Sequence, residues 1–136
     1  MQDAGYFVET LVEQTRTHRL ATARLRRSKG SDVIVDLLFA SSGIERELIS
    51  RASVLELLPS VELKVASVGD LLAVKVLARD DRTRPQDWDD LRALLAVATA
   101  EDRVQARESL RLISKRGFGR GRPLLKLWTE ALRDLG

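Results

Sequence analysis

The sequence predicts an α+β fold in which a small antiparallel sheet is followed by a helical bundle. The first 40 residues alternate between apolar and polar side chains, which is the period of a strand, whereas helix start signals recur from residue 42 onward. The chain of 136 residues fits a single domain. We therefore expect one compact unit with a sheet subdomain over residues 1–66 and a helical subdomain over residues 67–136.

Three strands are expected at the start of the chain. Tyr6–Gln14 and Arg19–Arg27 alternate in polarity along their length. Val33–Ala40 reads VIVDLLFA and is nearly all apolar, as in a strand that is covered on both faces. Because the joints between these segments are short enough for hairpins, the three strands predict an antiparallel meander.

The remainder of the chain predicts helices that open with capping boxes, in which a Ser or Thr is followed three residues later by an acid or Gln. An extended segment over residues 54–65, broken at Pro59, separates the first helix from the others. A last helix over residues 124–135 follows Arg122 and Pro123. The other four are expected at 44–52 with Ser42 and Glu45, 67–79 with Ser67 and Asp70, 83–98 with Thr83 and Gln86, and 99–117 with Thr99 and Asp102.

The composition excludes several kinds of site. The chain has no Cys and one His, so it offers no disulfide, no thiolate zinc site, no cysteine nucleophile and no multi-His metal site. Its apolar runs reach about eight residues, far below the roughly 20 that a bilayer span needs. No secretory signal opens the sequence. These absences predict a cytoplasmic protein with no membrane partner.

The basic residues are concentrated in two segments. Residues 14–31 and 109–129 each carry six Lys or Arg and no acid, and 18 of the 23 basic residues are Arg. The planar guanidinium suits phosphate, so the segments indicate a polyanionic partner, with solvated faces as the alternative. The candidates for phosphate binding are Arg24 and Arg26 in the first segment and Arg120 and Arg122 in the second.

Asp36 lies in the middle of an otherwise apolar strand, on the face that Ile34 and Leu38 share. A lone carboxylate buried there costs several kcal/mol unless it is paired, hydrogen-bonded or bound to a cation. Two interpretations stay open. Asp36 lies at a sheet rim or pairs with an Arg, or it is a carboxylate that faces a metal or acts as a general base.

Lys75 and Arg79 are four residues apart on one face of a predicted helix, and Asp87 and Asp90 are three apart on the next. A short loop makes the two helices antiparallel neighbours, so the cations can face the acids. The arrangement is either a structural ion-pair network or a site whose cations hold a substrate phosphate.

The segment 115–123, KRGFGRGRP, joins two helices. Its glycines leave backbone N–H groups open, and its arginines could hold phosphates. The alternative is a helix C-cap followed by a loop with solvated Arg.

Three stretches of the chain resemble a known family. The most specific of them is Val68–Leu95. In it five residues fall in the family's order and near its spacing: Lys75, Arg79, Asp87, Asp90 and Leu91. The sequence resembles the nucleotidyltransferase toxins of the AbiEii/AbiGii type, the toxin half of bacterial abortive-infection and related toxin–antitoxin pairs. The stretches are VDLLFASSGIERELI (Val35–Ile49), VGDLLAVKVLARDDRTRPQDWDDLRALL (Val68–Leu95) and LISKRGFGRGR (Leu112–Arg122).

The resemblance implies a nucleotidyltransferase fold of the polymerase-β type, of which the predicted sheet would be the C-terminal part, followed by a helical half. It also implies metal-dependent transfer (Mg²⁺ or Mn²⁺) of a nucleotide from an NTP to tRNA or another RNA, and a cognate antitoxin. By resemblance Asp36 is a carboxylate of the metal site, Lys75 contacts the triphosphate, and Asp87 or Asp90 orients that lysine or serves the acceptor. Arg79 is then a supporting phosphate or ion-pair residue.

The chain departs from the family at its start. The family's Gly-Ser or Gly-Gly turn and the following Asp-x-Asp pair, which holds both metals, have no counterpart here. Residues 1–136 thus look like the family fold without its first strand, phosphate loop and first helix. We expect an isolated chain of this kind to be incomplete or inactive as an enzyme. We also expect a homodimer or a missing N-terminal chain to cover the open strand edge. The alternative function is a non-catalytic, basic RNA- or protein-binding α+β module.

Overall fold

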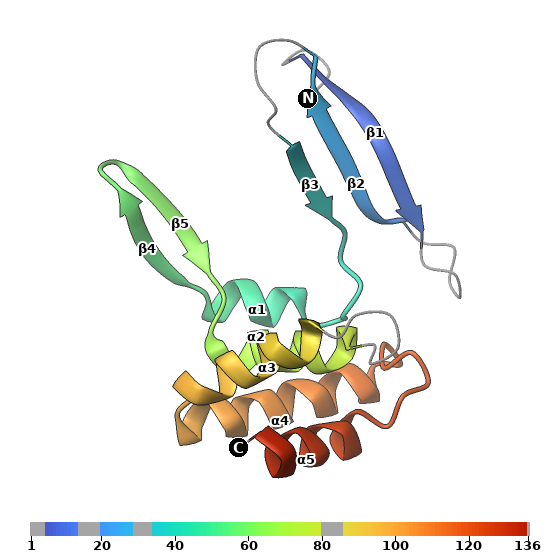
Figure 1. Cartoon of the computed structure of the whole chain (residues 1–136), viewed down its shortest axis with the longest axis vertical. Helices are drawn as coiled ribbons and strands as arrows, with labels where there is room; N and C mark the ends of the chain where they lie inside the picture. The colour runs from blue at the N-terminus through green and yellow to red at the C-terminus, as the bar shows by residue number, and fades with distance from the viewer. Residues whose placement is uncertain (1–4, 14–19, 29–33, 80–85, 136) are drawn as a thin grey trace. The chain divides into compact units, whose positions relative to one another are not determined.

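The computed structural model describes residues 5–13, 20–28, 34–79 and 86–135. It forms two compact units, unit 1 over Met1–Ser41 and unit 2 over Ser42–Gly136. Two small antiparallel sheets and five helices make up the described part, which confirms the predicted α+β class (Figure 1). The contacts divide the chain after Ser41, whereas the sequence placed residues 42–66 with the N-terminal sheet.

Unit 1 is the predicted three-stranded meander. The strands are β1 (Tyr6–Glu13), β2 (Leu20–Arg27) and β3 (Ile34–Leu38), paired antiparallel in the order β1-β2-β3. Ala23 and Leu25 of the central strand are buried. Directly opposite residues share a face in an antiparallel pair, so the alternate positions of β2, with Arg24 paired to Asp36, form the other face.

The expectation that β3 is covered on both faces is wrong for the described residues. Ile34 is 45% exposed and Leu37 is 37% exposed. β3 is an outer strand of the sheet, and Asp36 stands opposite Arg24, which makes that face polar. A run of apolar letters does not by itself distinguish a central strand from an outer one.

Unit 2 contains all five helices and the second sheet. Its core is apolar and is formed chiefly by residues of α2, α3, α4 and α5, with Leu72, Leu91, Leu110 and Trp128 fully or almost fully buried. Among the described helices none combines the length and apolar character needed to cross a bilayer. The elements are α1 (Glu45–Arg51), β4 (Ser53–Leu58), β5 (Val61–Val65), α2 (Val68–Ala78), α3 (Gln86–Val97), α4 (Ala100–Lys115) and α5 (Leu124–Leu135).

The predicted helix starts are confirmed at Ser67 and Thr99. The Ser67 hydroxyl accepts the backbone N–H of Asp70, and Thr99 with Asp102 forms a complete capping box. At α1 only the acidic half of the box forms, because the Glu45 carboxylate accepts the Ser42 backbone N–H at 2.6 Å. The start signal at Thr83 lies outside the described residues.

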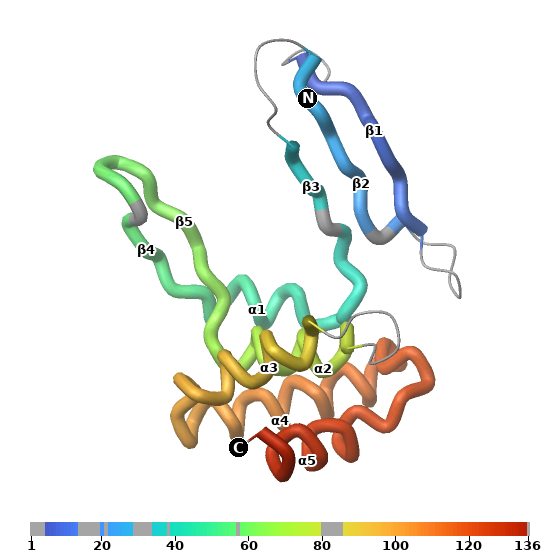
Figure 2. Tube along the Cα trace, in the orientation of Figure 1, coloured from blue at the N-terminus to red at the C-terminus, as the bar shows by residue number. Residues whose placement is uncertain are grey.

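The extended segment broken at Pro59 is a β-hairpin. β4 and β5 pair antiparallel around a turn at Pro59 and Ser60, where Ser60 has a φ of 67°. Figure 2 shows the hairpin leaving the helices of unit 2 as a two-stranded arm. The arm follows α1, which ends at Arg51, and it ends at Val65, just before Ser67 and α2.

Candidate functional site

The candidate site is formed where the last turns of α2 meet the first turns of α3. Lys75 lies in the last turn of α2 and Arg79 is its C-cap. Asp87 and Asp90 lie at the start of α3, where the positive end of the helix dipole favours acidic side chains. The predicted facing of the two pairs is confirmed for Lys75, which is close to both carboxylates.

The two aspartates differ in exposure. Lys75 Nζ donates to Asp90 Oδ2 at 2.5 Å, and the Asp90 side chain is 49% exposed. Lys75 Nζ lies 3.7 Å from Oδ1 of Asp87, which is fully buried. The ammonium is thus held between one carboxylate inside the helical core and one at its surface.

Arg79 contacts an aromatic ring of α3. Its guanidinium carbon lies 4.0 Å from the centroid of the Trp88 ring, a cation–π contact. Trp88 itself packs against the apolar core. This contact fixes the end of α2 against the start of α3, on which Lys75 and its acids depend.

This arrangement can bind an anion at its outer side. An ammonium has three N–H donors, so Lys75 can keep Asp87 and Asp90 as partners and still offer a donor. Its side chain retains 31% exposure. The exposed Asp90 is also the partner that an incoming phosphate oxygen can replace at least cost, since surface ion pairs contribute little.

Asp36 lies in unit 1 and is paired, not lone. Both of its oxygens accept from Arg24, Nε to Oδ1 and Nη2 to Oδ2, each at 2.8 Å. The hydrogen bond from Arg24 lowers the pKa of the Asp36 carboxyl. The expectation of a carboxylate in an apolar setting is wrong, because the side chain is 40% exposed on the face it shares with Arg24. The alternative, a pairing with an Arg, is confirmed.

The donor set of the described residues does not fit a metal ion. No three His, Cys, Asp or Glu side chains are grouped there. Both oxygens of Asp36, the predicted metal ligand, are bonded to Arg24. A Mg²⁺ ion needs oxygen ligands in near-octahedral order.

Three of the predicted phosphate-binding arginines, Arg24, Arg26 and Arg122, have partners among the described residues. Arg24 is bonded to Asp36, and Arg26 Nε donates to Glu9 Oε1 at 2.7 Å. Arg122 Nη1 donates to the backbone oxygen of Leu77 at 2.8 Å. Arg120 is exposed and takes a positive φ of 55°.

The segment after α4 has the geometry of a helix C-cap. Gly117 has a φ of 80°. The Phe118 N–H donates to the backbone oxygen of Ile113, five residues earlier, at 3.0 Å, and this hydrogen bond is the one that closes a Schellman motif. The N–H groups of Gly117 and Arg122 are also bonded within the chain. The Gly117 N–H, one of the glycine N–H groups expected to be open for a phosphate, therefore serves the local fold, as do those of Phe118 and Arg122.

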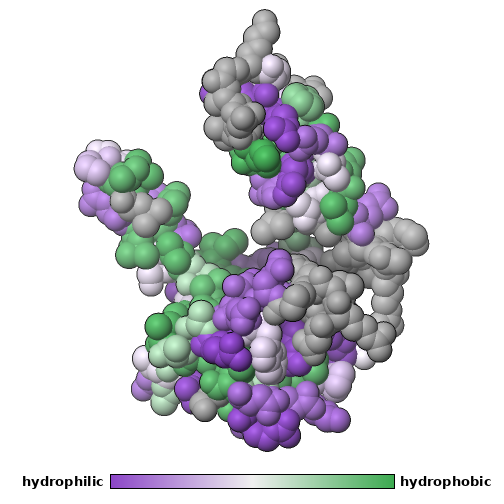
Figure 3. Space-filling view, in the orientation of Figure 1, coloured by the Kyte–Doolittle hydropathy of each residue, from purple (hydrophilic) through white to green (hydrophobic). Residues whose placement is uncertain are grey.

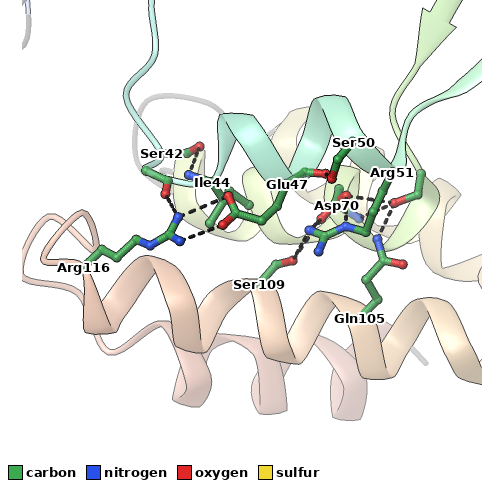
Figure 4. A network of polar contacts seen from close by, with 11 residues as sticks. Ser42, Ile44, Glu47, Ser50, Arg51, Asp70, Gln105, Ser109 and Arg116 are labelled. Carbon is green, nitrogen blue, oxygen red and sulfur yellow. Dashed lines mark hydrogen bonds and ion pairs between the residues drawn. The ribbon is translucent and has the colours of Figure 1, made fainter.

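A second polar cluster was missed by sequence reasoning. Asp70 in α2 is fully buried and receives Arg51 of α1 in a two-bond contact, Nη2 to Oδ1 at 2.6 Å and Nε to Oδ2 at 2.9 Å (Figure 4). Ser109 of α4 donates to Oδ1 at 2.9 Å, and Ser67 lies 3.1 Å from Oδ2. The sequence identified Asp70 only as a capping residue.

Burial is the largest single influence on Asp70 and raises its pKa. The hydrogen bonds from Arg51, Ser109 and Ser67, together with the charge of Arg51, outweigh it, so the net pKa of Asp70 lies below its usual value. Elsewhere on α1, the Glu47 carboxylate accepts hydrogen bonds at both oxygens from Arg116, the C-cap of α4. These bonds lower the pKa of the Glu47 carboxyl (Figure 4). These two contacts join α1 to α2 and α4.

The comparison with protein-family models finds one match that covers nearly the whole chain. Residues 4–134 match the model described as "Nucleotidyl transferase AbiEii toxin, Type IV TA system". No curated protein matches the chain. The matched range includes Lys75, Asp87 and Asp90, and a type IV toxin–antitoxin family implies a cognate antitoxin as partner. The chain therefore belongs to the AbiEii family of nucleotidyltransferase toxins.

Proposed function

We propose that this chain contributes to the transfer of a nucleotide from an NTP to RNA, with Lys75 contacting the triphosphate. The single observation that carries the proposal is the position of the Lys75 ammonium, 2.5 Å from exposed Asp90 and 3.7 Å from buried Asp87. Membership of a nucleotidyltransferase family supplies the reaction class. The acceptor, proposed to be tRNA or another RNA, agrees with the two basic segments.

Each residue of the site has a distinct part in this proposal. Nucleotide transfer joins an acceptor oxygen to the α-phosphorus and releases pyrophosphate, so negative charge develops on the leaving phosphates. Phosphoryl transfer is accelerated mainly by positioning and by charge stabilisation, and Lys75 supplies the positive charge. Buried Asp87 orients the ammonium from inside the core. Exposed Asp90 either is replaced by a phosphate oxygen as the acceptor of the Lys75 hydrogen bond, or it accepts the proton of the acceptor hydroxyl.

Mg²⁺ or Mn²⁺ as cofactor is a further part of the proposal, drawn from the resemblance. When bound, such an ion would neutralise the triphosphate and polarise the α-phosphorus. The described residues do not form a set of ligands for such an ion. Asp36 as a ligand requires that Arg24 release at least one of its oxygens.

A non-catalytic RNA- or protein-binding module is the second candidate function. The observation in its favour is that Arg24 and Asp36 are already paired with one another, as they would be in a sheet that has no catalytic part. In this case the cluster of Lys75, Asp87 and Asp90 is a structural ion-pair network. The partners to consider are RNA, the cognate antitoxin, and a second copy of the chain.

The test measures labelled nucleotide transferred to total RNA by the full chain with Mg²⁺, for the wild type, Lys75→Met and Arg107→Met. Arg107 is the control, since it is an exposed cation of α4 outside the two basic segments. The proposal requires transfer by the wild type and Arg107→Met and none by Lys75→Met, whereas the missing Asp-x-Asp pair predicts no transfer by any of the three. Tryptophan fluorescence verifies folding, because Trp88 and Trp128 both lie in unit 2.

Equal transfer by the wild type and Lys75→Met contradicts the proposed role of Lys75. Absence of transfer by the wild type, combined with RNA binding that weakens steeply as salt is raised, favours the binding module instead. Loss of folding in Lys75→Met, rather than loss of transfer alone, identifies the cluster as structural.

A further inference from the structure

The hairpin of β4 and β5 carries large apolar side chains that the described structure leaves exposed. Leu55, Leu63 and Val65 are between 36% and 49% exposed, and Val61 is 42% exposed. Figure 3 shows hydrophobic surface along this arm. A two-stranded hairpin is at best marginally stable alone, and stable sheets need further strands or a covering element. The hairpin therefore needs a partner.

The hairpin is also electrostatically unbalanced. The register places Glu56 directly opposite Glu62, a like-charge pair that weakens a sheet. Lys64 stands opposite apolar Val54. Among the described residues neither Glu62 nor Lys64 forms an ion pair. The negative charge of Glu62 and the positive charge of Lys64 thus remain uncompensated within this chain.

The free edge of β5 is complementary to itself. Among the described strands β5 pairs on one side only, with β4. If a second β5 pairs antiparallel with this edge about a two-fold axis at Leu63, Glu62 of each copy stands opposite Lys64 of the other. Leu63 then faces Leu63, and Val61 faces Val65. This register forms two ion pairs and three apolar cross-strand pairs at once.

The corresponding edge of β4 has no such register. Centred on Leu55, a pair of β4 strands places Glu56 opposite Val54 and forms no ion pair. Centred on Glu56, it places two glutamates opposite one another. The charge pattern therefore selects β5, and an isologous two-fold contact is the commonest symmetry of homo-oligomers.

We propose that the β5 edge is a homodimer interface, in which two hairpins join into one four-stranded antiparallel sheet in the order β4-β5-β5-β4. The occupant is a second copy of this chain. The contact is short, because β5 has five residues, so association is reversible and depends on protein concentration. Lysine on an edge strand also discourages unspecific pairing, and Lys64 in this register permits pairing only where Glu62 of the partner faces it.

The experiment is sedimentation of the full chain at increasing concentration, with charge variants of the β5 edge. Glu62→Lys and Lys64→Glu each convert two attractive pairs into two repulsive ones, and the dissociation constant should rise about tenfold or more. The double variant Glu62→Lys/Lys64→Glu restores both pairs and should dimerise like the wild type. An equimolar mixture of the two single variants should form a heterodimer.

Two controls separate association from folding and net charge. Glu62→Lys places a lysine opposite Glu56 in the same hairpin, so it relieves the internal repulsion and cannot weaken the hairpin by that route. Lys115→Glu makes the same charge change as Lys64→Glu on exposed α4 and should leave dimerisation unchanged. A monomeric wild type at all concentrations overturns the proposal, as do single variants that dimerise normally or a double variant that does not.

Discussion

Two buried aspartates of unit 2 show how differently one residue type can be used. Asp70 and Asp87 both have no solvent exposure. Asp70 receives two hydrogen bonds from Arg51 and one from Ser109, all between 2.6 and 2.9 Å. The Lys75 ammonium lies 3.7 Å from Asp87 and donates to exposed Asp90. The Arg51–Asp70 contact therefore consists of short, multiple bonds that fix helices, whereas the Lys75–Asp87 contact is longer and leaves the lysine available.

The geometry around each aspartate agrees with this distinction. Arg51 and Asp70 meet through a planar fork on a carboxylate, which fixes orientation as well as distance. Lysine is a compact charge on a flexible stem and can exchange partners without rearranging the helices. Stability should therefore depend most on Asp70, and nucleotide transfer on Asp87.

The largest expected effect is the loss of stability in Asp70→Ala. The change leaves Arg51 and Ser109 without their acceptor, and we expect a loss of about 2–4 kcal/mol in the free energy of unfolding. Urea unfolding followed by tryptophan fluorescence measures it. Glu108→Ala, at an exposed position of α4 beside Ser109, should change stability by less than about 0.5 kcal/mol. Equal effects of the two variants would refute the structural role of Asp70.

The second prediction concerns Gly69, which allows α2 and α4 to approach beside Asp70. A Cβ at this position would lie 2.7 Å from the Asp102 backbone oxygen and 2.9 Å from Gln105 Cβ. Gly69→Ala should therefore cost about 1–3 kcal/mol by forcing the helices apart. Gly119→Ala is the control, because a Cβ there meets atoms no closer than 3.6 Å. If both alanines are tolerated alike in urea unfolding, the close packing at Asp70 is not needed.

The third prediction is a dependence of stability on acid that originates from Asp70. Its pKa in the folded chain is lower than the usual value near 3.8, so folding favours the charged form. The stabilisation is complete above that usual value and disappears as the pH falls through the folded-state pKa. Unfolding free energies measured from about pH 6 to about pH 2 should therefore converge for the wild type and Asp70→Asn. A difference that stays constant over this range would show that the charge of Asp70 does not contribute.

The fourth prediction reverses the pattern at the other aspartate. Asp87→Asn keeps the shape of the buried side chain and leaves Lys75 its hydrogen bond to Asp90, so we expect a smaller loss of stability than in Asp70→Ala. Nucleotide transfer should be lost, because the Lys75 ammonium loses its inner partner. Asp89→Asn, an exposed neighbour in α3, should retain transfer. A variant Asp87→Asn that transfers normally but unfolds easily would make the two aspartates equivalent.

The smallest expected effect on stability is that of Asp36→Asn. The Arg24–Asp36 pair is solvent-exposed in unit 1, and many such surface pairs make no measurable contribution. Thermal unfolding followed by circular dichroism should be unchanged. A clear loss of stability would mean that this exposed pair contributes to stability as buried Asp70 does. Burial would then not explain the difference between the aspartates.

Local sequence signals predicted much of the fold. The caps at Ser67 and Thr99 depend on residues three positions apart, so they are visible in the sequence. The same holds for the approach of Lys75 to Asp87 and Asp90, because helical spacing and a short loop define which faces meet. The strands of unit 1 were likewise visible from their alternation.

Contacts between distant residues were not visible. Ser109 is 39 residues from Asp70, and nothing in the local pattern indicates that α4 brings its hydroxyl to that carboxylate. The environment of Asp36 stayed open for a related reason, since its partner Arg24 lies on another strand. The role of Arg122 was open for the same reason, because its acceptor is a backbone oxygen of α2.

The bond from Arg122 to the oxygen of Leu77 has a consequence for biosynthesis. Leu77 lies two residues beyond Lys75, so this arginine helps to hold the turn of α2 that carries the lysine. A ribosome makes Arg122 only after α2, α3 and α4 have been synthesised. The end of α2 therefore receives this support late in translation, and an unfinished chain that stops before Arg122 lacks it.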